Sequence, residues 1–430
     1  MIKTISTSQK GWKDKISRII DRSRLVPPDI DLKVRKIIDK VKAQGDKALF
    51  DYTLVFDGFD PKDRSIVIEA EEISSALSKI DPQLITALKE AAYRIDAFHQ
   101  HEIQDSWITT DSEGVILGQK ISPIDRVGVY IPGGKNAFPS TMLMNVIPAR
   151  IAGVKDIVVT TPTPKGEINP VLLAAAHIVG VEKIYRIGGA QAIAALAYGT
   201  ESIPKVDKIV GPGNIYVSHA KRLLYSTVGI DLVAGPSEIL IIADKGAKTH
   251  IVAMDLLSQA EHDPMASAIL LTPDKSLADD VLKQISIEVS SMPREKIIKQ
   301  SLMNHGVCVI TKDIDEAIKI SNRVAPEHLE LMIENAYEYL DEIENAGAIF
   351  LGYHTSEVLG DYIAGPNHTL PTGRASRFYS PLGVYDFLKR SSIIGFSEQA
   401  LEKLGPMAAR IARSEELEAH ARSVEYRLKG

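Results

Sequence analysis

The chain has 430 residues and a formal net charge of −6; 45% of its residues are hydrophobic and 25% are charged. The acidic balance argues against a nucleic-acid partner or an anionic membrane surface, and no apolar run approaches the roughly 20 residues of a transmembrane helix. The lone cysteine, Cys308, excludes an intrachain disulfide framework and fits a cytoplasmic protein.

Residues 1–125 are expected to form a helical N-terminal region that packs on the second of two α/β modules. Apolar residues recur at helical spacing over residues 31–50 and again over residues 73–98. No residue in these stretches suggests chemistry, so we interpret the region as scaffold.

Strands and helices alternate over residues 126–236 and predict a first Rossmann-like module. The strands recur about every 25 to 30 residues, as βαβ units require. The expected strands are Val127–Ile131, Asp156–Thr160, Lys183–Ile187 and Asp207–Val210, and the expected helices are Thr141–Ala152, Pro170–Val179, Ala190–Tyr198 and Ile215–Leu224.

The same alternation over residues 237–380 predicts a second Rossmann-like module. Two successive modules predict an α/β fold of two doubly wound units with a cleft between them. The expected strands are Ile239–Ala243, Ala268–Thr272, Gly306–Ile310 and Ala348–Leu351, and the expected helices are Thr249–Ala260, Leu277–Val289 and Ile314–Asn322.

Residues 381–430 are expected to form a charged, helical C-terminal tail. The sequence Gly405-Pro406 is predicted to separate its two helices. A tail this amphipathic rarely packs alone, so we expect it to dock elsewhere on the protein or on a partner subunit.

Four glycine-rich loops each follow a predicted strand of the first module. Loops of this kind lie at the carboxyl edge of an open α/β sheet, where ligands bind, and the helix N-termini after them favour pyrophosphate. No GxGxxG fingerprint is present, so a dinucleotide would bind in an atypical way; the loops could also be simple tight turns. They are residues 130–135, 188–191, 211–214 and 234–238.

Gln259 and His262 lie three residues apart at the end of a predicted helix that Pro264 terminates. An amide oxygen and an imidazole on one helix face make half of a zinc site with mixed nitrogen and oxygen ligands. The simpler interpretation is a solvated helix end that carries a stray histidine.

Two further clusters carry groups that can move protons. Glu327 and His328 are adjacent in an apparently irregular turn, where a carboxylate could activate water and an imidazole could shuttle a proton. Asp361 and His368 are the chemically useful members of the glycine- and proline-rich loop at 360–373. Each of these clusters, taken alone, is also compatible with an ordinary polar surface.

Taken together, these segments resemble the histidinol dehydrogenase family. They follow one order from about residue 125 to the C-terminus, whereas the N-terminal helices carry no comparably specific motif. The matching stretches are VGVYIPGG, IGGAQAIAALAYGT, KIVGPGNIYV, DLVAGPSEIL, DLLSQAEHDP, APEHLEL, GDYIAGPNHTLPTG and EELEAHARSV.

The resemblance implies the oxidation of L-histidinol to L-histidine through L-histidinaldehyde with two NAD, in a homodimer with one zinc ion per subunit. It implies that Glu327 and His328 are catalytic and that His420 and Glu415 act in the partner's site. The implied zinc ligands are Gln259, His262, Asp361 and His420. The implied substrate contacts are Ser237, His368 and Glu415 together with His328 and the zinc ligands. The implied NAD contacts are Tyr130, Gln191 and Asn214.

Several alternatives stay open. Locally, Glu415 and His420 fit a solvated helix. A zinc-dependent NAD dehydrogenase of another polyol or amino-alcohol would share most of this site, and a two-lobed binding protein without activity would share the cleft. An aldehyde can also be oxidised through a cysteine thiohemiacetal. Because Cys308 lies in a predicted buried strand outside every cluster, we expect attack by water instead.

Overall fold

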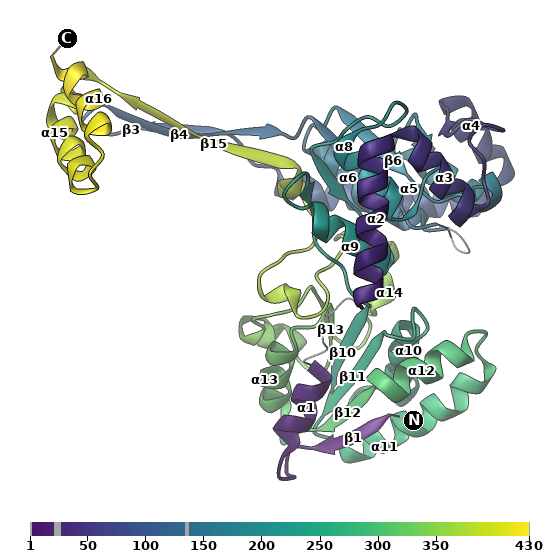
Figure 1. The fold of residues 1–430 in the computed structure, drawn as a ribbon. Helices are drawn as coiled ribbons and strands as arrows, with labels where there is room; N and C mark the ends of the chain where they lie inside the picture. Colours follow the sequence, from purple (N-terminus) through teal and green to yellow (C-terminus); the bar gives the residue numbers. More distant parts are fainter. Residues whose placement is uncertain (1, 21–26, 134–136, 430) are drawn as a thin grey trace.

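The computed structural model describes residues 2–20, 27–133 and 137–429. Two α/β bodies lie one above the other in Figure 1, and a long β-ribbon projects from the upper body. Among the described helices, none combines the length and the apolar character needed to cross a membrane.

The upper body is built on a six-stranded sheet that is parallel except at one edge. The order of its five parallel strands is that of a Rossmann-like unit, and the chain reverses direction across the sheet between β5 and β8. The sheet runs β2 (Val67–Ile68), β7 (Ile184–Tyr185), β6 (Asp156–Thr160), β5 (Arg126–Tyr130), β8 (Lys208–Val210) and β9 (Gly229–Ile230).

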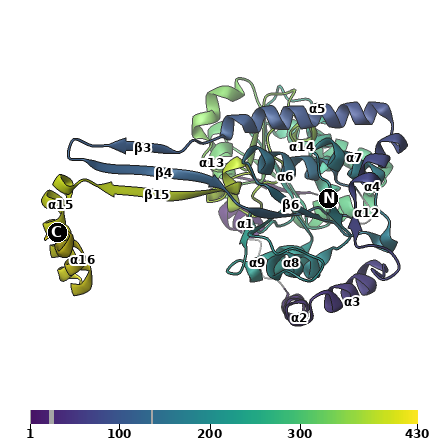
Figure 2. The same ribbon diagram turned by 90° about the horizontal axis from the view of Figure 1, so that it is seen from above.

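Helices cover both faces of this sheet (Figure 2). Residues 190–197 are buried throughout because the helix that carries them, α8, lies between the sheet and α2. The helices are α2 (Pro28–Gln44), α3 (Asp46–Asp57), α4 (Ala70–Ser75), α5 (Pro82–His99), α6 (Pro139–Ile151), α7 (Pro170–Ile178), α8 (Gly189–Tyr198) and α9 (Ile215–Leu224), with short 3₁₀ turns at Ala76–Lys79, Gln100–Glu102 and Pro164–Gly166.

The lower body repeats the same strand order in a six-stranded sheet whose strand pairs are all parallel. Its central strand β10 reads EILIIA and is buried on both faces, as parallel sheets covered by helices require. The sheet runs β1 (Lys3–Ser6), β12 (Val307–Ile310), β11 (Ser267–Thr272), β10 (Glu238–Ala243), β13 (His328–Met332) and β14 (Ala348–Leu351).

The helices of the lower body include two that the sequence analysis did not predict, α12 and α14. The helices are α1 (Trp12–Ile20), α10 (Thr249–Ala260), α11 (Lys275–Glu288), α12 (Glu295–His305), α13 (Ile314–Val324) and α14 (Glu357–Tyr362), with 3₁₀ turns at Val289–Ser291 and Ala336–Glu342.

The N-terminal region is divided between the two bodies, which corrects the prediction that residues 1–125 pack on the second module. Only β1 and α1 join the lower body, where β1 adds an edge strand beside β12. Helices α2 to α5 instead contact α6, α7, α8 and α9 of the upper body. The reason is the apolar stripe of α2 (Val34, Ile37, Ile38 and Val41), which packs into the same core cluster as the small side chains of α8.

A three-stranded antiparallel ribbon forms the projecting arm, and none of its strands was predicted from the sequence. It consists of β3 (Trp107–Thr110), β4 (Val115–Pro123) and β15 (Leu388–Phe396), where β15 pairs with β4 along its whole length. Two 3₁₀ turns, Ala375–Arg377 and Val384–Phe387, precede the ribbon's last strand.

The tail over 381–430 is therefore not wholly helical, because β15 comes before its helices α15 (Glu398–Ser414) and α16 (Glu418–Leu428). Gly405-Pro406 lies inside α15 and does not separate the helices, as had been predicted. The break falls instead at Glu416, whose left-handed φ of 61° ends the helical path.

Candidate active site

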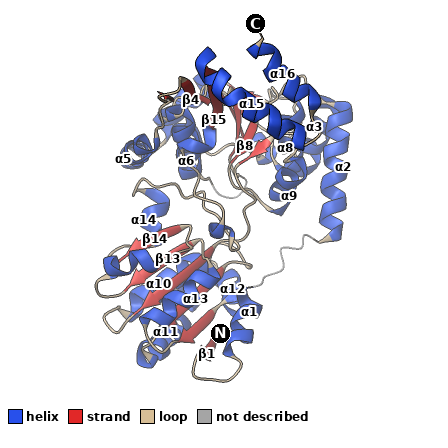
Figure 3. Ribbon diagram, turned by 90° about the vertical axis from the view of Figure 1, so that its left-hand side faces the viewer, coloured by secondary structure: helices blue, strands red, loops and turns tan. Residues whose placement is uncertain are grey.

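The polar loops of the two bodies meet between the two sheets (Figure 3). Strands β5 and β8 of the upper sheet end there at Tyr130 and Val210, whereas β10 and β13 of the lower sheet begin there at Glu238 and His328. The upper sheet thus contributes its carboxyl edge, as expected for an open α/β sheet, but the lower sheet contributes its amino edge.

Glu327 directly precedes strand β13, an inner strand of the lower sheet, and His328 begins it, so the pair does not lie in an irregular turn as the sequence had suggested. Both side chains are buried. The Nδ1 of His328 lies 2.9 Å from the carbonyl oxygen of Glu238, and Oε2 of Glu327 accepts the backbone N–H of Glu238 at 2.8 Å. Because a carbonyl can only accept, His328 carries a proton on Nδ1, which leaves Nε2 as the nitrogen that can exchange a proton with a bound molecule.

The electrostatics of the pair reflect burial among several carboxylates. Burial raises the pKa of Glu327 to about 8, against the opposing effect of the His328 ring. Burial also disfavours the charged form of His328, but Glu327, Glu357 and Asp361 outweigh this effect and raise the pKa of His328 to about 10. Carboxylates therefore dominate this part of the site.

Asp361 lies on α14 among three imidazoles. Its Oδ1 is 3.7 Å from Nε2 of His328. Burial alone would raise the pKa of Asp361, but His328, His368 and His262 outweigh burial and lower it. The ring of His368 is fixed from two sides, since Nδ1 lies 3.0 Å from the backbone oxygen of Asp361 and Nε2 lies 3.4 Å from Oγ1 of Thr141 on α6.

The end of α10 brings Gln259 and His262, the predicted half of the zinc site, close to Asp361 and His328. Gln259 is fully buried in the last turn of α10, and the backbone N–H of His262 donates to the carbonyl of Gln259 at 3.2 Å. His262 interacts electrostatically with both Asp361 and His328. Ser237, which is partly buried, directly precedes Glu238 at the start of β10.

The donor set fits a divalent cation. Ligand atoms of His328, Glu357 and Asp361 all lie within 4.8 Å of one another. Nε2 of His328 is buried and has no hydrogen-bond partner among the described residues. Of these three residues, only Asp361 belongs to the predicted zinc ligands. An excess of buried carboxylates around an imidazole nitrogen that has no hydrogen bond is what a zinc ion would compensate.

His420 and Glu415 do not join this cluster. His420 lies on α16, Glu415 follows α15, and both side chains are exposed. The two helices sit at the tip of the arm, away from the loops between the sheets (Figures 1 and 2). Within one chain, the predicted ligand set is therefore incomplete.

The three residues predicted to contact NAD lie at the carboxyl edge of the upper sheet, and two of them hold backbone there. The hydroxyl of buried Tyr130 accepts the N–H of Gly189 at 3.1 Å, and Asn214 caps α9 by accepting the N–H groups of Tyr216 and Val217. Gln191 is buried at the start of α8. Of the loop at 130–135, Gly134 and Lys135 lie outside the described residues.

A buried ion pair that the sequence analysis missed secures the loop at 211–214. Asp231 pairs with Lys221, accepts the N–H of Gly211 at 2.8 Å, and leaves the Lys221 ammonium to donate to the Gly211 carbonyl at 2.9 Å. Gly211 has a φ of 106°, and a Cβ there would lie 2.1 Å from the Tyr130 carbonyl oxygen. Only glycine fits between these two loops.

Glu330 is a second residue that the sequence did not single out. It is fully buried in β13, two residues after His328, and its Oε1 accepts the N–H of Glu357 at 2.7 Å. This bond holds the first turn of α14, one turn before Asp361. An acidic residue inside a parallel strand could have been the signal, because it needs a buried partner.

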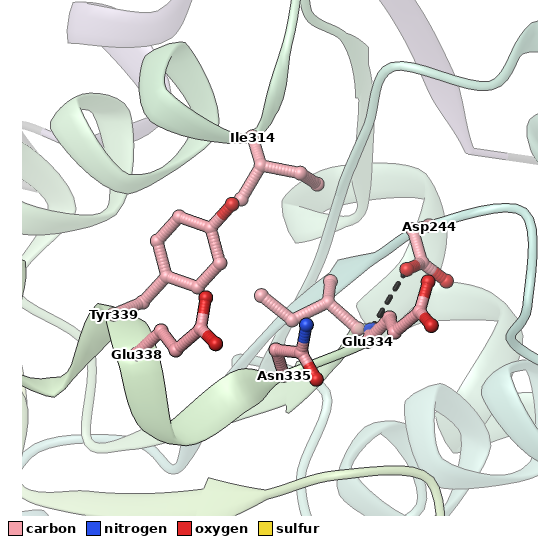
Figure 4. A pocket seen from close by; sticks show the side chains of 7 residues that line it. Asp244, Ile314, Glu334, Asn335, Glu338 and Tyr339 are labelled. Atoms are coloured by element: carbon pink, nitrogen blue, oxygen red, sulfur yellow. Dashed lines mark hydrogen bonds between the residues drawn. The ribbon is translucent and has the colours of Figure 1, made fainter.

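A cavity of about 260 Å³ lies at the opposite, carboxyl edge of the lower sheet. The carboxylate of Asp244 is already engaged there, since it accepts the N–H groups of Gly246 and Glu334 and the hydroxyl of Tyr353. None of the predicted site residues lines this cavity. Figure 4 shows the side chains that line it and labels Asp244, Ile314, Glu334, Asn335, Glu338 and Tyr339.

Two Rossmann-like modules with a buried glutamate–histidine pair between them fit the class of NAD-dependent dehydrogenases. The histidinol dehydrogenase family model matches residues 21–428. The chain is 48% identical over its full length to histidinol dehydrogenases of Syntrophotalea carbinolica and Neisseria meningitidis, each also matched over 100% of its length.

A solved structure agrees with these relatives. The crystal structure of histidinol dehydrogenase from Elizabethkingia anophelis superposes with a TM-score of 0.93 at 39% identity, covering 100% of this chain and 98% of the other. The chain therefore belongs to the histidinol dehydrogenase family, whose members use NAD to oxidise L-histidinol in histidine biosynthesis.

The lone cysteine has no place in this site. Cys308 is fully buried in β12, and burial raises the pKa of its thiol to about 12. We expect Cys308→Ala to keep kcat within about twofold, because a thiol that stays protonated is no nucleophile. Steady-state kinetics check this, with thermal unfolding as the control for folding. Loss of turnover in a folded variant would contradict it.

Proposed function

We propose that the chain performs both oxidations of L-histidinol among the loops where the two bodies meet, with His328 as the acid–base residue of the first step and Glu327 as the base of the second. The observation that carries this proposal is the pairing of both side chains to the backbone of one residue, Glu238, at the start of β10. This arrangement fixes an imidazole and a carboxylate side by side in a buried place.

A zinc ion, one per subunit, would be held by Gln259, His262 and Asp361 of one chain. Its chemistry would be to bind the amine and imidazole of histidinol and so to position the substrate. We assign His420, from the partner subunit, as the fourth ligand. Ser237, His368 and the partner's Glu415 would contact the substrate.

In the first step, the carbinol carbon of histidinol transfers a hydride to NAD. His328, in its neutral form, accepts the hydroxyl proton on Nε2, because Nδ1 is occupied by the Glu238 carbonyl. The carboxylates that raise the pKa of His328 to about 10 stabilise the imidazolium that this proton transfer forms. The products are L-histidinaldehyde and NADH. Tyr130, Gln191 and Asn214 would hold the NAD at the edge of the upper sheet.

In the second step, Glu327 removes a proton from water, and the resulting hydroxide adds to the aldehyde carbon to form the anion of the hydrate, from which the second hydride leaves. Oε2 of Glu327 is held by the Glu238 N–H, so Oε1 is the oxygen left for water. A pKa raised to about 8 by burial suits a carboxylate that exchanges protons near neutral pH. A second hydride transfer to a second NAD then yields L-histidine.

A homodimer would complete each site. The arm carries α15 and α16 away from the loops between their own chain's two sheets, and this placement supports the proposal that His420 and Glu415 serve the partner (Figure 1). Large apolar side chains on the ribbon are exposed in the single chain, as expected of a surface that a partner covers. They include Trp107, Ile108, Leu117, Ile394 and Phe396. A cytoplasmic location fits the reduced, buried Cys308.

Glu327→Gln should slow the oxidation of added L-histidinaldehyde by about 10²–10⁴-fold, the usual contribution of a general base. Oxidation of the alcohol should fall much less, since His328 remains. Single-turnover NADH formation from each substrate separates the two steps. Equal losses in both steps would contradict the assignment of Glu327 to water.

If each site takes residues from both subunits, two inactive variants should complement each other in a mixed dimer. His420→Ala and Gln259→Ala should each lose zinc and activity, but their co-expression should restore about one quarter of the parent activity, because half the dimers are mixed and each has one intact site. Zinc content and turnover are the measurements. Co-expression of Gln259→Ala with Asp361→Ala is the matched control, and it should restore nothing because both residues come from the same chain.

A dehydrogenase of another amino-alcohol remains the second candidate, because most of the site would serve it equally. The number of NADH formed per L-histidinol consumed distinguishes the two functions in the zinc-loaded protein. We expect a ratio near two. A ratio near one would mean that the aldehyde is released, and it would remove the role given to Glu327.

A further inference from the structure

A buried carboxylate with no role in the steps above lies beside the proposed zinc ligands. Glu357 is only 2% exposed and begins α14, four residues before Asp361. One of its oxygens lies within 4.8 Å of the ligand atoms of both His328 and Asp361. A carboxylate in such a place needs hydrogen-bond donors.

The side-chain amide of Gln259 supplies those donors. With its nitrogen toward Glu357, the amide donates to Oε1 at 2.7 Å and to Oε2 at 3.0 Å, while its oxygen accepts the backbone N–H of Glu238 at 3.1 Å. The reverse orientation would set the amide oxygen against two carboxylate oxygens and its nitrogen against an N–H group. The neighbouring groups therefore select one orientation.

We propose that Glu357 is a positioning residue that holds Gln259 by its amide nitrogen, so that the amide oxygen faces away from Glu357 and serves as the metal ligand. The inference rests on the zinc site proposed above. An amide binds metals through oxygen, because the nitrogen lone pair is delocalised into the carbonyl. Carboxylates that orient a ligand from behind are a general feature of protein metal sites.

Glu357 is itself held in place. The buried Oε1 of Glu330 accepts the backbone N–H of Glu357 at 2.7 Å, and Glu330 stands on the same strand as His328. A continuous chain of contacts thus runs from β13 through Glu330 and Glu357 to Gln259 at the end of α10. This chain couples two elements that are distant in sequence, the strand of the catalytic pair and the helix of the first two ligands.

The test is the affinity of the full-length protein for zinc alone, measured by competition with a chromogenic chelator. Glu357→Gln should bind zinc about 10–100-fold more weakly, the usual cost of removing a group that orients a ligand. Its side chain offers one acceptor and one donor, so the Gln259 amide is no longer held in one orientation. Glu338→Gln, an exposed glutamate on the far edge of the same module, is the matched control and should keep the parent affinity.

A double-mutant cycle separates positioning from direct ligation. If Glu357 acts only through Gln259, then adding Glu357→Gln to Gln259→Ala should change the zinc affinity no further. Losses that add in the double variant, or parent-like affinity in Glu357→Gln, would overturn the proposal. Should Glu357→Gln fail to fold, Glu357→Asp keeps the charge but withdraws it by one methylene, and it should also weaken zinc binding; full affinity there would overturn the proposal as well.

The same series distinguishes this inference from the zinc site on which it rests. If Gln259→Ala keeps the parent affinity, the proposed zinc site is wrong, and the role of Glu357 falls with it. If Gln259→Ala loses zinc while Glu357→Gln retains it, the zinc site stands and only the inference is wrong.

Discussion

The backbone of Glu238, the first residue of β10, is the point on which the site depends. Its carbonyl fixes the ring of His328, and its N–H binds Glu327 and lies within reach of the Gln259 oxygen. Backbone groups at the end of a central strand move little, because the strand is bonded on both sides. The side chains of His328, Glu327 and Gln259 are thus all positioned by the same rigid strand, β10.

The carboxyl edge of the upper sheet faces the amino edge of the lower sheet because of how the chain connects the two sheets. Strand β9 leaves the upper sheet at its carboxyl edge, and only residues 231–237 separate it from the start of β10. So short a link must bring the amino edge of the second sheet against the first. The two modules share one strand order, but they use opposite edges for the site.

Periodicity in the sequence was enough to predict the two α/β modules, because their strands are apolar and regularly spaced. It could not predict where α2 to α5 pack, since an apolar stripe does not identify the surface that covers it. The ribbon was missed because its strands are largely exposed and lack a strong apolar pattern. The family resemblance identified Gln259 and Asp361 as expected zinc ligands. Glu330 and Glu357 could not be identified in this way, because their contacts join segments that are distant in the sequence, and one sequence does not reveal such contacts.

The placement of β1 has a consequence for the order in which the protein can fold during synthesis. Lys3 pairs with Val307, so the edge strand of the lower sheet emerges from the ribosome long before its partner β12. At ordinary rates of translation, a gap of about 300 residues corresponds to roughly 15–60 s. Throughout that interval β1 has no neighbour to pair with, and until it docks, β12 is an uncovered edge open to pairing with other chains. The lower body is therefore completed late, although its first strand is made early.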